Sequence, residues 1–137
     1  MRITIKNTIN GRIMKRELIV KIRYDKTKPI VKHAHDEFGR DVYTVWQERV
    51  TTVSCHEYDP ENESSTTLYV GRTVCNYHDN KNFSKSTGRM LAWFNCLDEM
   101  LKSDFIGEDE EAMLEEINLN ATAVEVDVAK QTVKKLI

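Results

Sequence analysis

The sequence predicts an α+β fold, a single domain spanning residues 1–137, in which an N-terminal antiparallel β-sheet (a hairpin or meander) is followed by two or three C-terminal α-helices. Alternating β-branched and aromatic residues are concentrated before residue 78, and the helical spacing of apolar residues begins at residue 84. Strands that precede helices as a group are typical of α+β folds rather than alternating α/β folds. A chain of 137 residues, 40% of them hydrophobic, is long enough to form one hydrophobic core.

The first two strands are expected to pair as an antiparallel hairpin over residues 2–9 and 17–24. Apolar residues alternate with polar ones in both segments, and Tyr24 falls on the same face of the second segment as Leu18. The dipeptide Asn10-Gly11 lies between them and is a strong signal for a tight turn.

The middle of the predicted sheet is less regular. Residues 25–40 contain Pro29 and are expected to form a loop, with room for a short strand at 29–33. The spacing of residues 41–57 fits either a strand or a helix, but their many valines and threonines favour a strand. After a polar loop, residues 67–77 are expected to form its partner strand.

A helix is predicted from Ser84 to Ser103, with Ser84 or Ser86 as its N-cap. Its core stripe is expected to consist of apolar residues at helical spacing, namely Met90, Phe94, Leu97 and Leu101. Trp93 then lies on a different face. This additional apolar face could form a dimer interface. Alternatively, the tryptophan packs against the last helix.

Two further helices are expected after Gly107. The first is acidic and covers residues 108–118. The second covers residues 121–136, where Val126 and Val133 belong to a helical stripe, although the run VEVDV fits a strand as well.

Charge is distributed unevenly along the chain, although its formal net charge is only −2. Residues 1–32 carry ten cations and two anions, and residues 104–116 carry seven acids and no base. This asymmetry suggests internal pairing or self-association, and the low net charge argues against nucleic acid as a partner. No apolar run is long enough to span a membrane, so no membrane partner is expected.

The residues that could carry catalysis or bind a metal do not form a recognisable motif. Three cysteines without CxxC spacing are expected to be reduced thiols in a cytosolic protein. His33 and His35 could share a strand face with Asp36, but nothing else has ligand spacing, so we expect no metal. No nucleophile and base can be placed together from the sequence, and we expect a protein without catalytic residues or a cofactor.

The most informative feature is a set of three cations, Lys81, Lys85 and Arg89, at four-residue spacing where the long helix begins. Residues four apart share a helix face, and a helix N-terminus is already electropositive. Cations there oppose the helix dipole and indicate an anionic partner. Phe83, just before the helix, could pack as a hydrophobic staple or stack on a purine.

Two other residues could contribute to this site. Gly88 lies in the first turns of the helix, where glycine costs about 1 kcal/mol relative to alanine and is usually kept for close approach. Arg72 lies in the strand that leads to the helix and could point at the same site, although for this residue taken alone an ordinary surface arginine is the favoured interpretation.

The segment DNKNFSKSTGRMLAW resembles a motif of small phage proteins, and among these the chain resembles the anti-defence proteins that counter the Thoeris system. The match covers about a fifth of the chain and departs from the family at Trp93-Phe94-Asn95. The matching residues are Cys75, Asp79 or Asn80, Phe83, Ser84, Lys85, Gly88 and Arg89.

The resemblance implies a protein that sequesters a cyclic ADP-ribose-type signal in the host cell cytoplasm without cleaving it. It implies a homodimer or higher homo-oligomer with ligand pockets at the subunit interface. Phe83 would stack on adenine, and Lys85, Arg89 and Arg72 would meet the diphosphate. The polar or small residues Asn82, Asn95, Ser84 and Gly88 would complete the ligand site. An alternative from a different class is a protein-binding inhibitor that uses the acidic helix, residues 108–116.

Overall fold

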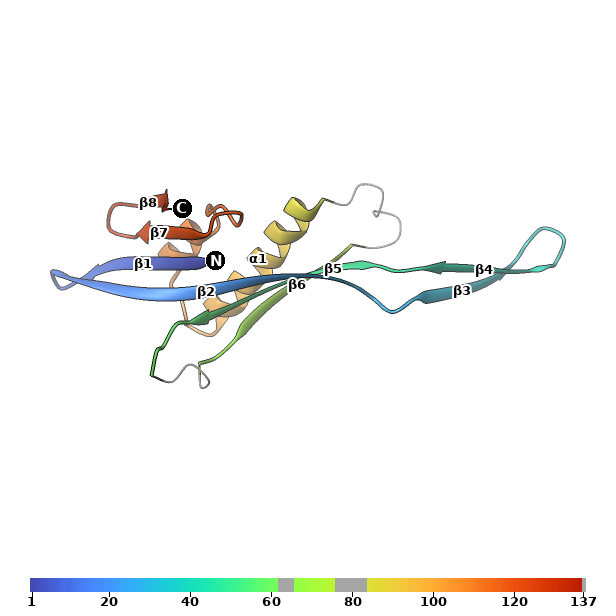
Figure 1. The fold of residues 1–137 in the computed structure, drawn as a ribbon, viewed down its shortest axis with the longest axis horizontal. Coiled ribbons are helices and arrows are strands. Elements are labelled where there is room, and N and C mark those ends of the chain that lie inside the picture. The colour runs from blue at the N-terminus through green and yellow to red at the C-terminus, as the bar shows by residue number, and fades with distance from the viewer. Residues whose placement is uncertain (62–65, 76–83, 137) are drawn as a thin grey trace.

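The computed structural model describes residues 1–61, 66–75 and 84–136. It is an α+β structure built on a six-stranded mixed sheet with the strand order β6-β5-β2-β1-β7-β8, and β3 and β4 form a separate two-stranded sheet (Figure 1). The elements are β1 (Arg2–Ile9), β2 (Arg12–Lys26), β3 (Ile30–His35), β4 (Asp41–Trp46), β5 (Arg49–Glu57), β6 (Tyr69–Cys75), α1 (Lys85–Lys102), α2 (Glu108–Leu114), β7 (Ala123–Asp127) and β8 (Thr132–Lys135).

The predicted N-terminal hairpin is confirmed as β1 and β2. Its two turn residues, Asn10 and Gly11, both have positive φ, 52° and 77°. Two positive φ values are typical of the type I′ turn, whose twist matches that of the flanking strands. β2 continues beyond the expected end at residue 24 and pairs with β5 on its other side.

Residues 30–46 form a hairpin arm, made of β3 and β4, that projects from the end of the main sheet (Figure 1). Within the expected loop over 25–40, the short strand expected at 29–33 is confirmed as β3, which continues to His35, and the expected strand 41–57 is interrupted before β5. The interruption is held by Thr27, whose amide donates to the Glu48 carbonyl (2.9 Å) and whose hydroxyl accepts from the Glu48 amide (3.0 Å). Pro29 has no amide hydrogen for the ladder, so pairing resumes only at Ile30.

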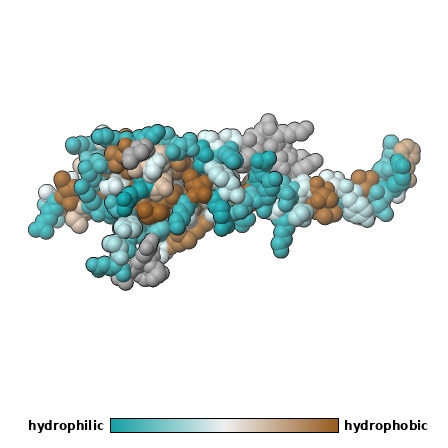
Figure 2. Space-filling view, in the orientation of Figure 1, coloured by the Kyte–Doolittle hydropathy of each residue, from teal (hydrophilic) through white to brown (hydrophobic). Residues whose placement is uncertain are grey.

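The arm leaves apolar side chains in contact with solvent, visible as brown patches along it in Figure 2. Phe38 at the tip is 74% exposed, Tyr43 62% and Val45 61%. A two-stranded hairpin is marginally stable on its own, so such a surface is a candidate for contact with another molecule.

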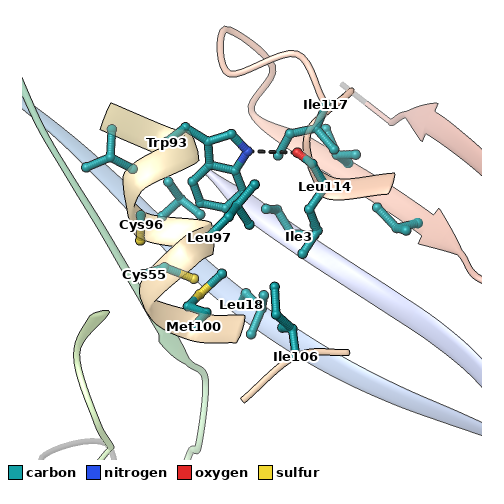
Figure 3. Packing of buried hydrophobic residues seen from close by; sticks show 14 of the residues in the cluster. Ile3, Leu18, Cys55, Trp93, Cys96, Leu97, Met100, Ile106, Leu114 and Ile117 are labelled. Carbon is teal, nitrogen blue, oxygen red and sulfur yellow. Dashed lines mark hydrogen bonds between the residues drawn. The ribbon is translucent and has the colours of Figure 1, made fainter. Parts of the chain in front are cut away.

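The core lies between the helices and one face of the main sheet (Figure 3). Alternation along each strand places Ile3, Leu18 and Val53 on this face, where α1 packs over β5 and β6. The predicted helix over 121–136 is wrong. Residues 123–135 form the β7–β8 hairpin, and β7 pairs in parallel with β1.

The strand alternative for the VEVDV run is the one that the structure adopts. Val124 and Val126 face the same core as Ile3 and Ile5, their neighbours on β1, and each is almost fully buried. The free edge of β1 needs a partner strand. The alternation of apolar and polar residues in VEVDV suits a strand with one buried face, so this segment pairs with β1.

α1 confirms the predicted helix over 84–103, and Ser84 is its N-cap, with Oγ accepting from the Thr87 amide at 3.4 Å. Its buried stripe differs from the expected one. Met90 is 45% exposed, whereas Trp93 is 1% exposed and donates from Nε1 to the Leu114 carbonyl at 2.7 Å (Figure 3). Of the two alternatives for Trp93, the extra face for dimer contacts is therefore wrong, and the residue packs against a later helix, α2, instead.

The rotation of α1 follows from its close approach to β6. A Cβ atom at Gly71 would lie 1.9 Å from the Ala92 carbonyl oxygen and 2.3 Å from the Cys96 amide nitrogen. The small side chains of Ala92 and Cys96 therefore face the sheet. That seating turns Trp93, one position further on, into the core.

α2 confirms an acidic helix after Gly107, although it is shorter than expected and ends at Leu114. Glu110 caps it, accepting from the Gly107 amide at 3.1 Å. Acids in a first turn are stabilised by the helix dipole, which gives these residues a structural role. Among the described residues, no helix is both long enough and apolar enough to cross a membrane.

Candidate functional site

The first two turns of α1 lie over the end of β2. The ammonium group of Lys85 lies 5.0 Å from the centre of the Tyr24 ring, and the Arg89 guanidinium donates to the Tyr24 hydroxyl at 3.0 Å. The predicted shared face of Lys85 and Arg89 is confirmed by these contacts. Lys81, the third cation of the series, lies outside the described residues.

A groove of about 480 Å³ opens beside Tyr24. It is lined by Tyr24, Asp25, Lys26, Arg49, Val50 and Lys85. Its volume falls in the range usual for small-molecule sites. Three cations against one acid make the groove electropositive, and the aromatic ring gives it a flat apolar surface. An anion joined to a planar ring would match both properties.

Two hydroxyl groups lie in the same row of the sheet as Tyr24. The strand register aligns Tyr24 with Thr51 and Thr51 with Thr73. Within the described part of the chain, the hydroxyl oxygens of Thr51 and Thr73 are buried without a hydrogen-bond partner. An unpaired buried hydroxyl costs roughly 1–3 kcal/mol. Neither threonine is among the residues that line the groove.

The structure does not bring Arg72 to the groove. Arg72 aligns with Thr52 and Thr52 with Arg23, whereas Tyr24 belongs to the neighbouring row, and successive residues of a strand face opposite sides. Arg72 therefore lies on the outer face of the sheet, in an adjoining hollow with Arg23 and Thr52 that shares Asp25, Lys26 and Val50 with the groove. Its expected place beside Lys85 and Arg89 is corrected accordingly.

The remaining predicted site residues divide into three groups. Ser84 is the helix cap and Gly88 is buried within α1, so both support the position of the groove's cations. Asn95 donates from its side-chain amide to the Arg72 carbonyl at 2.9 Å, a contact that covers the backbone of the edge strand β6. Phe83 and Asn82 lie outside the described residues.

Three groove residues, Tyr24, Lys26 and Arg49, were not predicted. Tyr24 was expected only as the last apolar residue of a strand face, Lys26 was counted only among the cations of residues 1–32, and Arg49 was given no role in a site. Tyr24 pairs with Thr51 and Lys26 with Arg49 across β2 and β5, whereas Lys85 comes from a distant helix. The spacing of residues along the chain cannot predict that these side chains lie close together.

Two of the cysteines are poor candidates for catalysis. Burial raises the pKa of Cys55 well above its usual range, and burial likewise raises the pKa of Cys96 to about 12. Both thiols are therefore protonated at neutral pH. A protonated thiol is neither a nucleophile nor a metal ligand.

Carboxylates crowd around α2 on another part of the surface. Burial is the first cause that raises the pKa of Glu111, followed by the charges of Glu115, Asp98 and Glu108. Because the folded state binds this proton more tightly than the unfolded state, protonation of Glu111 contributes to the free energy of unfolding. This contribution is fully present at a pH below the pKa of the unfolded state. It is lost as the pH rises through the raised pKa.

We expect Glu111→Gln to raise the melting temperature at pH 7, because partial burial disfavours this carboxylate and like-charge repulsion between residues four apart adds roughly 0.2–0.5 kcal/mol. The gain should disappear near pH 3, where the wild-type carboxyl is protonated. Thermal unfolding at both pH values measures it. Glu116→Gln, which removes the same charge at an exposed position, should give a smaller gain, and an equal gain would contradict the assignment to Glu111.

Comparisons of the chain with models of protein families, with curated proteins and with solved structures found no match.

Proposed function

We propose that this protein is a phage anti-defence protein that binds and sequesters a cyclic ADP-ribose-type signal, a cyclic adenine nucleotide, without cleaving it. One observation carries the proposal. Tyr24 lines the groove together with Lys26, Arg49 and Lys85, and its hydroxyl accepts a hydrogen bond from Arg89, which is not itself a lining residue. The motif that begins α1 resembles that of proteins with this activity, and it supplies two of these four cations.

The chemistry of the ligand fits this groove. A cyclic ADP-ribose isomer carries two phosphates and a purine, which call for cations and for an aromatic surface. Guanidinium groups form paired hydrogen bonds with phosphate, and ammonium groups act as point charges. Base stacking on an aromatic side chain contributes roughly 1–3 kcal/mol per base. Tyr24 would supply that surface, alone or with Phe83.

Sequestration also requires that the ligand be enclosed, and one chain leaves Tyr24 38% exposed. A second copy of the chain would close the groove, in keeping with the homodimer or larger homo-oligomer that the resemblance implies. The exposed apolar side chains of the arm, among them Val31 and Val45, offer a surface for such an assembly.

The proposal predicts that Arg89→Ala weakens binding of a cyclic ADP-ribose isomer by roughly 1–3 kcal/mol, through the loss of a charged hydrogen bond. Tyr24→Ala should have an effect of similar size, through the loss of a stacking surface. Calorimetric titration measures both. Heating the complex to denature the protein should then release the ligand chemically intact.

Arg72→Ala provides the matched control, because it removes the same charge from the opposite face of the sheet. It should bind as tightly as the wild type. Weakening by Arg72→Ala alone would move the site to the outer face, and chemically altered ligand after release would indicate an enzyme instead. Wild-type affinity in both Arg89→Ala and Tyr24→Ala would exclude this groove.

A protein-binding inhibitor or regulator is the second candidate, and the crowded carboxylates around Glu111 favour it. The carboxylates repel one another in the free protein, and a basic partner that covered them would reduce this repulsion. If the protein acts in this way, reversing the charges of Glu108 and Glu115 would abolish binding of the protein partner, and Tyr24→Ala would leave that binding unchanged.

A further inference from the structure

Two histidines and an aspartate come together on one face of the β3–β4 arm. His33 and His35 are two residues apart on β3, so both side chains leave the same face of the strand. The register pairs His35 directly with Asp41, the first residue of β4, and opposite residues share a face. Strand pairing thus collects three metal-binding side chains from both strands of the hairpin.

The donor atoms of these side chains already have a spacing close to that of a metal site. Asp41 Oδ1 lies 2.8 Å from His33 Nε2 and 3.4 Å from His35 Nδ1, and all three atoms lie within 4.8 Å of one another. Donors on one tetrahedral Zn²⁺, at its usual bond lengths, are about 3.3 Å apart. Small side-chain rotations would therefore bring all three atoms to one ion.

The tip of the arm holds the two strands in this register. Asp36 Oδ1 accepts from the backbone amides of Phe38 and Arg40, and Oδ2 accepts from the Arg40 guanidinium, each at 2.9 Å. Asp36 is thus engaged in the turn, and Asp41 is the carboxylate that faces the histidines.

The ring of His33 is positioned by Tyr43, its cross-strand partner. The two rings stack with their centres 4.8 Å apart and their planes 19° apart. A ring that is already oriented loses less conformational freedom when it binds an ion, so Tyr43 acts as a positioning residue.

We propose that His33, His35 and Asp41 bind a divalent first-row transition metal, with Zn²⁺ as the ion that suits them best. Two imidazoles and a carboxylate are typical ligands of Zn²⁺, whereas Mg²⁺ and Ca²⁺ prefer oxygen ligands alone. Three protein ligands leave one tetrahedral position for water or for a group from a second molecule. This replaces the expectation of no metal, which rested on spacing along the chain.

The arm site shares no residue with the groove beside Tyr24, so the metal proposal stands independently of nucleotide binding. Titration of the full, tag-free chain with ZnCl₂ in a calorimeter should show one ion bound per chain, and MgCl₂ should give no binding. Titration with CoCl₂ should produce visible absorption bands from nitrogen and oxygen coordination. His33→Ala and Asp41→Asn should each weaken Zn²⁺ binding by at least about tenfold.

Three control variants separate this site from other causes. Lys32→Ala changes the opposite face of β3 and should keep full affinity, which excludes a general disturbance of the arm. His56→Ala and Cys75→Ser remove side chains of types that can bind a metal but that lie outside the proposed site, and both variants should also keep full Zn²⁺ affinity. Absence of Zn²⁺ binding, or a loss caused by His56→Ala or Cys75→Ser but not by His33→Ala, would overturn the proposal.

Discussion

Gly71→Ala is expected to destabilise the protein by at least about 3 kcal/mol, at the upper end of what overpacking costs. The new methyl group would lie 1.9 Å from the Ala92 carbonyl oxygen, 2.3 Å from the Cys96 amide nitrogen and 2.9 Å from the Cys96 Cα. All three are backbone atoms of α1, so no side chain can rotate away. The helix would have to move off β6. Urea denaturation followed by circular dichroism measures the loss.

Gly107→Ala provides the comparison for this experiment. A Cβ atom there would meet only Glu110 Oε1, at the ordinary contact distance of 3.7 Å. We expect a loss below about 1 kcal/mol, from the weaker N-cap. If Gly71→Ala were as mild as Gly107→Ala, α1 could not lie as close to β6 as the structure places it, and the positions of Lys85 and Arg89 over Tyr24 would be in doubt as well.

Trp93→Ala is expected to cost about 3–5 kcal/mol of unfolding free energy, as is usual for a large aromatic side chain in a core. Trp93 is 1% exposed and its Nε1 donates to the Leu114 carbonyl at 2.7 Å, which ties α1 to the end of α2 (Figure 3). Denaturant unfolding measures the loss. Circular dichroism is the appropriate signal, because the substitution removes one of only two tryptophans.

Trp93→Phe separates packing from hydrogen bonding. It keeps an aromatic ring but leaves the Leu114 carbonyl without its donor, a change that costs roughly 1–3 kcal/mol. Its stability should fall between those of the wild type and Trp93→Ala. If instead Trp93→Ala unfolded like the wild type but altered the oligomeric state, the residue would belong to an interface between chains and not to the core.

The parts of the fold that sequence reasoning predicted are those with local signals. Asn10-Gly11 set the first hairpin, and Ser84 set the start of α1, because turn and cap preferences act within a few residues. The rotation of α1 was not predictable in this way. It depends on Gly71, which permits a close approach that no apolar spacing within the helix reports. Likewise, β7 is a strand because β1 offers it an edge.

The residues of the candidate site likewise divide into those with a local sequence signal and those placed by contacts between distant segments. Lys85 and Arg89 could be found from their spacing on one helix. Tyr24 could not be assigned to them, because its contact with α1 depends on how the helix lies on the sheet. Arg72 was misplaced because which face of β6 meets α1 depends on Gly71, one residue before it.

The parallel pairing of β1 with β7 has a consequence for the newly made chain. β1 precedes residues 123–127 in the chain and is therefore synthesised before them, yet these residues form one of its two neighbours in the sheet. Until the ribosome has released that segment, one side of β1 presents unpaired backbone groups next to Ile3 and Ile5. A bare apolar strand edge is a template for pairing with other chains. Nascent copies translated from one message are therefore exposed to mutual aggregation until β7 is inserted.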